Sequence, residues 1–285
     1  MDPLGLSARG GGQVLFFLSG LGHLSAALIV TPDLTERQLD PCETGPIDLF
    51  SLPPDWSALF SRAAPVEVPP TVLLGILAVA AALSIPRVTW QQFGLFTTLV
   101  HELGHAVAGL LTGRAVTGIR IRRNHSGEAL STGRGSIGAV VSGIFGYPAP
   151  AIVGAAQLWS VFNGYTAIAL FAGGIALLLT LLVIRNLFGV LVVLASAGVS
   201  AALWFFATPQ QQSYALLVLG TALLVGSVRA LVSVIRVHTR RGRLGSSDAY
   251  LLYKRTGVPS FVWLLLFAAA IGGCWWIAVT AYLTR

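Results

Sequence analysis

Residues 93–113, FGLFTTLVHELGHAVAGLLTG, form an apolar run long enough to cross a bilayer, with His101, Glu102 and His105 near its centre. These three are the only ionisable side chains in the run. A charged side chain at bilayer depth costs about 2.5–3.5 kcal/mol on insertion scales, and such residues usually have a function. The run therefore predicts a membrane helix that carries a functional site.

The three ionisable residues form the motif H-E-x-x-H. On a helix, His101 and His105 lie one turn apart on the same face, so both imidazoles can bind one metal ion. Glu102 is rotated by about 100° from His101, which puts its carboxylate beside the metal and suits it to act as a general base. The alternative is a pair of buried histidines bonded to the backbone or to Glu102. Because an apolar helix offers few polar partners, the motif favours a metal site.

Composition indicates a polytopic helical membrane protein. Hydrophobic residues make up 55% of the chain, charged residues make up 10%, and the mean hydropathy is +0.78. The net charge of +7 comes from arginines concentrated in loops, where they set membrane orientation, so we expect no nucleic-acid partner. Arginine strongly outnumbers lysine and alanine and glycine are abundant, which suggests a GC-rich bacterial genome.

The apolar runs predict an all-α fold of about seven to eight transmembrane helices. Besides residues 93–113, the predicted spans are 71–86, 136–158, 165–184, 187–207, 214–235 and 260–282, with a weak span or interfacial helix at 14–30. Residues 31–70 are polar and proline-rich and predict a loop or cap. We therefore expect an N-terminal part, residues 1–70, and a membrane-embedded domain, residues 71–285.

Two local patterns interrupt this series of helices. Residues 116–122 alternate apolar and basic, Asn124–Gly127 form a turn signal, and residues 128–132 can return, which predicts a short β-hairpin directly after the HELGH helix. Its edge could hold an extended peptide by strand addition, although an ordinary basic loop is an equal alternative. The span at 136–158 contains SGIFGYPAP and must be kinked or broken.

Arginine-rich loops orient the chain in the membrane. Segments 114–134, 185 and 236–255 fall on one side if every span from residue 93 onward crosses fully, and that side is predicted to be the cytoplasm. The expected location is the cell membrane of a bacterium, with several passes through the lipid bilayer.

A catalytic zinc ion needs a third protein ligand besides His101 and His105, and an open position for water. The candidates after Glu102 are Glu128, Asp248, His125 and His238. Asp248 stands at the membrane edge without acidic neighbours; it could instead cap a helix or pair with arginines. The need for a third ligand favours Asp248, and the other three candidates stay open.

These features together resemble the site-2 protease family of intramembrane zinc metallopeptidases, in particular its compact bacterial branch without PDZ or CBS domains. The resemblance covers roughly residues 93–260. It implies Zn²⁺ bound by His101, His105 and an aspartate, with Glu102 as general base. The implied reaction is hydrolysis of a peptide bond within or beside a membrane helix of a membrane-protein substrate.

The sequence departs from the family pattern at the aspartate. Ser247-Asp248-Ala249 stands where relatives have an LDG-type motif, so Asp248 matches by role and order. Asn186 in RNLFG resembles an asparagine that helps to hold substrate in relatives. Two other functions are weighed against proteolysis: an inactive membrane scaffold or chaperone that keeps the fold, and a cation transporter. A transporter would more often show an internal repeat, and the sequence shows none.

Overall fold

The predicted helices and hairpin are both present in the computed structural model, which describes residues 62–64, 66–133, 135–240 and 247–284. All of these belong to one compact unit, residues 53–285. The weak span predicted at 14–30 and most of the predicted cap lie outside the described residues.

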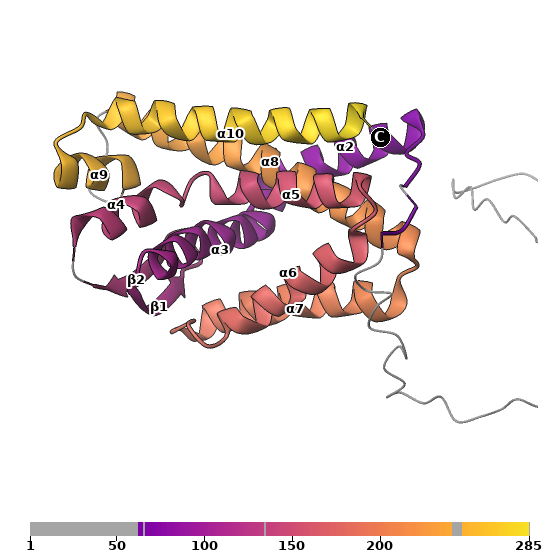
Figure 1. The fold of residues 1–285 in the computed structure, drawn as a ribbon, viewed down its shortest axis with the longest axis horizontal. Helices are drawn as coiled ribbons and strands as arrows, with labels where there is room; N and C mark the ends of the chain where they lie inside the picture. The colour runs from indigo at the N-terminus through magenta and orange to yellow at the C-terminus, as the bar shows by residue number, and fades with distance from the viewer. Residues whose placement is uncertain (1–61, 65, 134, 241–246, 285) are drawn as a thin grey trace, which may run out of the picture. The chain divides into compact units, whose positions relative to one another are not determined.

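Helices dominate the described chain, and Figure 1 shows their arrangement. The elements in order are α2 (Pro70–Ser84), α3 (Arg87–Leu111), β1 (Ala115–Ile121), β2 (Gly127–Thr132), α4 (Ser136–Ile144), α5 (Ala149–Phe162), α6 (Thr166–Thr180), α7 (Leu187–Phe206), α8 (Pro209–Thr239), α9 (Asp248–Thr256) and α10 (Ser260–Leu283). The helical class and the hairpin are confirmed.

The predicted count of seven to eight spans is not confirmed. Among the described residues, α7, α8 and α10 are long and apolar enough to cross a membrane, and two bent pairs bring the number to at most five. Spans predicted separately at 71–86 and 93–113 are the pair α2 and α3, which meet at 89°. Helix α6 has 15 residues, fewer than the roughly 20 that a crossing helix needs.

Prolines account for both bends, because proline lacks an N–H and clashes with the preceding turn. Pro86 has an extended backbone between α2 and α3. Pro148 and Pro150 begin α5 after a break from α4, and the two helices meet at 59°. The predicted break in residues 136–158 is therefore confirmed.

Helix α8 packs against α2, α5 and α10 and supplies much of the buried core, including Leu223 and Leu224. It approaches α5 closely at two glycines. A Cβ at Gly220 would come within 2.8 Å of the Gly154 carbonyl oxygen, so only glycine fits there. Small residues at such crossings are the usual device for close helix packing in membranes.

The hairpin has a second partner on its β1 side. Strands β1 and β2 are antiparallel, with Ile119 opposite Ala129 and Ile121 opposite Gly127. On the other side of β1, the Ile119 N–H donates to Val183 O at 2.8 Å, and the Arg185 N–H donates to Ile119 O at 2.8 Å. The chain between α6 and α7 thus covers the edge of the hairpin on the β1 side. The other edge of the hairpin belongs to β2, which lies next to α3.

The predicted arginine-rich segments gather at one end of the helices. The hairpin lies beside the α6–α7 connection, and α9 packs against α4 (Figure 1). At the far end of α5, the Ala63 N–H donates to Gly164 O at 3.0 Å. The residues just before α2 therefore lie near the far end of α5, away from the hairpin and α9 (Figure 1).

Candidate metal centre

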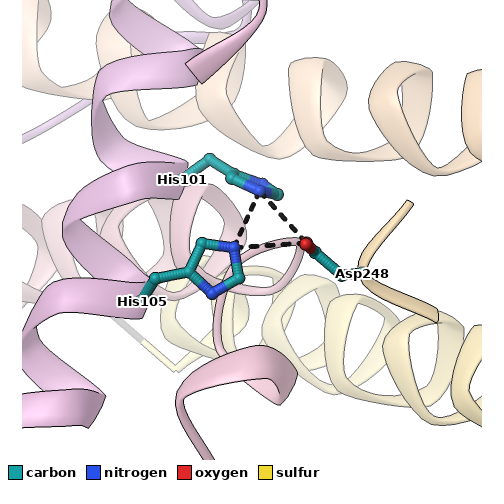
Figure 2. Close-up of side chains that lie close together, drawn as sticks. All are labelled: His101, His105 and Asp248. Carbon is teal, nitrogen blue, oxygen red and sulfur yellow. Dashed lines mark hydrogen bonds and ion pairs between the residues drawn. The ribbon is translucent and has the colours of Figure 1, made fainter. Parts of the chain in front are cut away.

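Three side chains from two distant segments converge on one point (Figure 2). His101 and His105 lie one turn apart on α3, and Asp248 is the first residue of α9. The two Nε2 atoms are 3.1 Å apart, and each lies 3.2 Å from Asp248 Oδ2. The structure thus brings together the two motif histidines and the aspartate predicted to join them.

The converging atoms lie within hydrogen-bond and ion-pair distance of one another. His105 Nδ1 lies 2.6 Å from the Ser142 carbonyl oxygen, which can only accept, so Nδ1 carries the proton and Nε2 of the neutral ring carries a lone pair. Asp248 Oδ2 is buried and has no hydrogen-bond partner of suitable geometry among the described residues, although both imidazoles are at ion-pair distance. With both rings neutral and their Nε2 atoms unprotonated, three lone pairs would face one point, an arrangement that a bound cation would stabilise.

The triangle has the size that zinc requires. Ligands about 2.0–2.1 Å from a tetrahedral zinc ion are about 3.3 Å apart. The three observed separations are 3.1, 3.2 and 3.2 Å. Two imidazole nitrogens and one carboxylate oxygen also form a known donor set of catalytic zinc sites, which leaves a fourth position open. The residues present fit the metal that the sequence predicts.

Electrostatics keep the carboxylate of this group ionised. Without a metal, burial opposes the charge of Asp248, but the positive charge that the neighbouring His105 and His101 imidazoles can carry outweighs burial and holds the pKa of the Asp248 carboxyl below its ordinary value. An ionised carboxylate is the form that binds a metal.

Glu102 lies beside this group and is not part of it. It is 5% exposed and lines the same cavity as the three converging side chains. Its carboxylate accepts a hydrogen bond from the backbone N–H of Ala129 in β2. A Cβ at Gly127 would overlap the same carboxylate, so glycine at the start of β2 makes this close approach possible. Glu102 is therefore held at the outer edge of β2.

The break between α4 and α5 supports the two histidines, which the sequence did not reveal. Besides accepting from His105 Nδ1 through its carbonyl oxygen, Ser142 donates from Oγ to His105 O at 2.8 Å. Gly146 lies directly against both imidazoles, and a Cβ there would overlap them. The Tyr147 ring meets the His101 ring edge-on, with centroids 4.8 Å apart. The glycines and prolines of SGIFGYPAP are the signal that could have indicated this close packing.

A cavity of about 1000 Å³ surrounds the site. Its walls include Glu102, the three converging side chains, residues 127–131 of β2 and four arginines, namely Arg114, Arg122, Arg229 and Arg255. This volume lies at the upper end of the range for ligand sites and can admit several residues of an extended peptide.

The other candidates for a third ligand have different partners. His125 Nε2 lies 3.2 Å from Gln91 O, Arg122 Nη2 donates to Glu128 Oε2 at 3.3 Å, and His238 Nε2 is hydrogen-bonded to Ser247 Oγ at 2.8 Å. Within the described ranges, the metal-binding group contains none of these three candidates.

Asn186 lies on the far side of the hairpin. Its Nδ2 donates to Ile121 O at 2.7 Å, and its Oδ1 accepts from the Ile121 N–H at 3.1 Å. It does not line the cavity among the described residues. These contacts anchor the start of α7 to β1, and a role for Asn186 in substrate binding stays a prediction.

Comparison with known protein families gives a match over most of the chain. A family model described as peptidase M50B-like matches residues 74–278. The matched region begins inside α2 and includes α3, the hairpin, the bent pair α4 and α5, and all three converging side chains. No curated protein and no solved structure matches the chain.

Proposed function

We propose, because this chain belongs to the peptidase M50B-like family of site-2 proteases, that it is a zinc metallopeptidase that hydrolyses peptide bonds within or next to transmembrane segments of other membrane proteins. The observation that carries the proposal is the convergence of His101, His105 and Asp248 beside the buried Glu102 in one cavity.

Each residue of the site has a chemical part. Bound zinc would supply Lewis acidity to the attacking water and to the scissile carbonyl. Glu102 accepts the proton of the attacking water and later delivers it to the leaving amine. His101, His105 and Asp248 hold the metal, and the Ser142 carbonyl oxygen keeps the Nε2 lone pair of His105 available by holding the proton on Nδ1.

The outer edge of β2 offers a surface for an extended substrate. The N–H and C=O of Ile119 are hydrogen-bonded to the α6–α7 connection, so Ile119 and Ala129 form a non-hydrogen-bonded pair. The backbone N–H and C=O of Ala129 therefore point away from β1. Ile121 and Gly127 also form a non-hydrogen-bonded pair, because the Asn186 side chain bonds to the N–H and C=O of Ile121. The Ala129 N–H on this edge already donates to Glu102, so an added peptide would bond to the remaining backbone groups of β2, next to Glu102.

A transmembrane substrate reaches that edge only after it has locally unwound, because an intact helix uses its own amide groups. Asn186 can influence such a substrate through the hairpin, whose β1 strand it fixes.

The apolar helices support a multi-pass location in the cell membrane. Helix α7 is apolar and largely exposed, with Phe205 75% and Phe206 88% exposed, as expected of a helix in contact with lipid. The arginine-rich end that carries the hairpin and α9 would face the cytoplasm. The metal centre lies toward this end, which gives water a route to it.

The proposal is tested by cleavage of a membrane substrate. Purified wild-type protein is reconstituted with a panel of labelled single-span proteins, and products are located by mass spectrometry. Cleavage within or beside the span, lost in Glu102→Gln or with a zinc chelator and restored by added Zn²⁺, supports the proposal. Cleavage that persists in Glu102→Gln contradicts the role of Glu102. Zinc-loaded protein that cleaves no member of the panel favours the scaffold function.

A further inference from the structure

A polar contact joins the end of α8 to the start of α9, directly before Asp248. His238 lies in the last turn of α8, and Ser247 is the residue that precedes α9. His238 Nε2 and Ser247 Oγ are hydrogen-bonded at 2.8 Å, and Ser247 is only 5% exposed. The contact therefore ties two helices together one residue away from the carboxylate of the metal centre.

The Ser247 hydroxyl does not have the usual task of a serine at this position. A serine before a helix normally accepts a hydrogen bond from an N–H of the first turn. Ser247 makes no such side-chain bond, although its carbonyl oxygen accepts the Tyr250 and Leu251 N–H groups at 3.0 and 2.9 Å. Its backbone is thus fixed by α9 and its side chain by α8.

Helix α8 is a rigid reference for this contact, because it is packed against α2, α5 and α10. The rest of α9 is held by apolar packing: Ala249 is 0% and Leu252 is 1% exposed, and the helix lies against α4 and α10. Apolar contacts hold a short helix against its neighbours but leave it free to slide or rotate slightly. The bond to His238 adds a directional restraint at the end that carries Asp248.

We propose that His238 is a positioning residue of the metal centre, acting through Ser247 to hold Asp248 at its place opposite His101 and His105. This inference rests on the proposed function of that centre as a zinc site. His238, one of the candidates for the third ligand, thus serves the metal indirectly.

The test measures zinc affinity of the full chain in detergent by competition with a chelator of known affinity. The variants are His238→Ala, Ser247→Ala, the double variant and His238→Gln, whose amide can still bond to Ser247. Thr239→Ala is the matched control, because Thr239 lies in the same helical turn and, among the residues that the structure describes, its side chain bonds only to Arg236 O at 3.1 Å.

Either alanine variant is expected to weaken zinc binding by about 2- to 12-fold, the range for loss of one neutral hydrogen bond. The double variant should lose no more zinc affinity than the single variant with the larger loss, because the two side chains act as one pair. His238→Gln and Thr239→Ala should bind zinc as the wild type does. The visible spectrum of bound Co²⁺ should shift in His238→Ala and be restored in His238→Gln.

Two results overturn the inference separately from the proposed function. If His238→Ala binds zinc with wild-type affinity and gives an unchanged Co²⁺ spectrum, or if the two single effects add fully in the double variant, His238 does not position Asp248. If the wild type itself binds no zinc, the proposed function fails and the inference fails with it.

Discussion

Replacing Gly146 by alanine should prevent zinc binding although none of the three proposed metal ligands is mutated. A Cβ at this position would lie 2.5 Å from His105 Cε1 and 2.9 Å from His101 Cε1. Carbon atoms in contact are normally about 3.5–4.0 Å apart, so the His105 ring must retreat by about 1 Å. Metal–ligand distances tolerate only about ±0.2 Å. We therefore expect zinc affinity to fall by more than about 100-fold, the upper end of the range for loss of a supporting partner of a metal ligand.

The assay is zinc binding by the purified full chain, with thermal unfolding of the metal-free protein as a check on folding. Gly173→Ala is the matched control, because a Cβ at Gly173 in α6 meets no atom of the described residues within 4 Å. That variant should bind zinc as the wild type does. A Gly146→Ala protein that binds one zinc ion with wild-type affinity would refute the close approach of the α4–α5 break to the two imidazoles.

Two further substitutions test the placement of Glu102 and the contacts that stabilise the bend between α2 and α3. Gly127→Ala would bring a Cβ to 2.6 Å from Glu102 Cδ and displace the Glu102 carboxylate. The variant should keep its zinc but lose about 100-fold in kcat/KM, the cost of misplacing a reacting group by about 1 Å. A wild-type kcat/KM would contradict this. Arg229 donates to Ser84 O at 2.7 Å and to Ile85 O, and its guanidinium lies 4.5 Å over the Trp90 ring. Arg229→Met should therefore lower the free energy of unfolding by about 1.5–3 kcal/mol in detergent. An unchanged Tm would mean that these contacts do not stabilise the bend between α2 and α3.

Much of the candidate metal site could be predicted, because the histidines have a local signal and the third ligand has few candidates. His101 and His105 reveal themselves by their spacing and by their apolar surroundings. Asp248 was one of four possible third ligands, and only the packing of α9 against α4 and α10 brings it to the histidines. The hairpin followed from alternation over residues 116–122.

The supporting contacts could not be predicted, because they join segments that are far apart in sequence. The bond from His105 Nδ1 to Ser142 O spans 37 residues, and that between Asn186 and Ile121 spans 65. Neither serine nor asparagine has a pattern that reveals such a partner. The predicted number of spans is not confirmed for a related reason: hydropathy detects apolar runs but not the 89° bend that joins two of them into one pair.

The metal content of purified protein shows whether His101, His105 and Asp248 bind zinc. Wild type, His101→Ala, Asp248→Ala and Glu102→Gln are purified in detergent without chelator, and zinc per chain is measured by mass spectrometry. We predict one zinc ion in the wild type and in Glu102→Gln, and loss of the ion in His101→Ala and Asp248→Ala. Full zinc in Asp248→Ala, or none in the wild type, would contradict the assignment of His101, His105 and Asp248 as the ligands of a catalytic zinc.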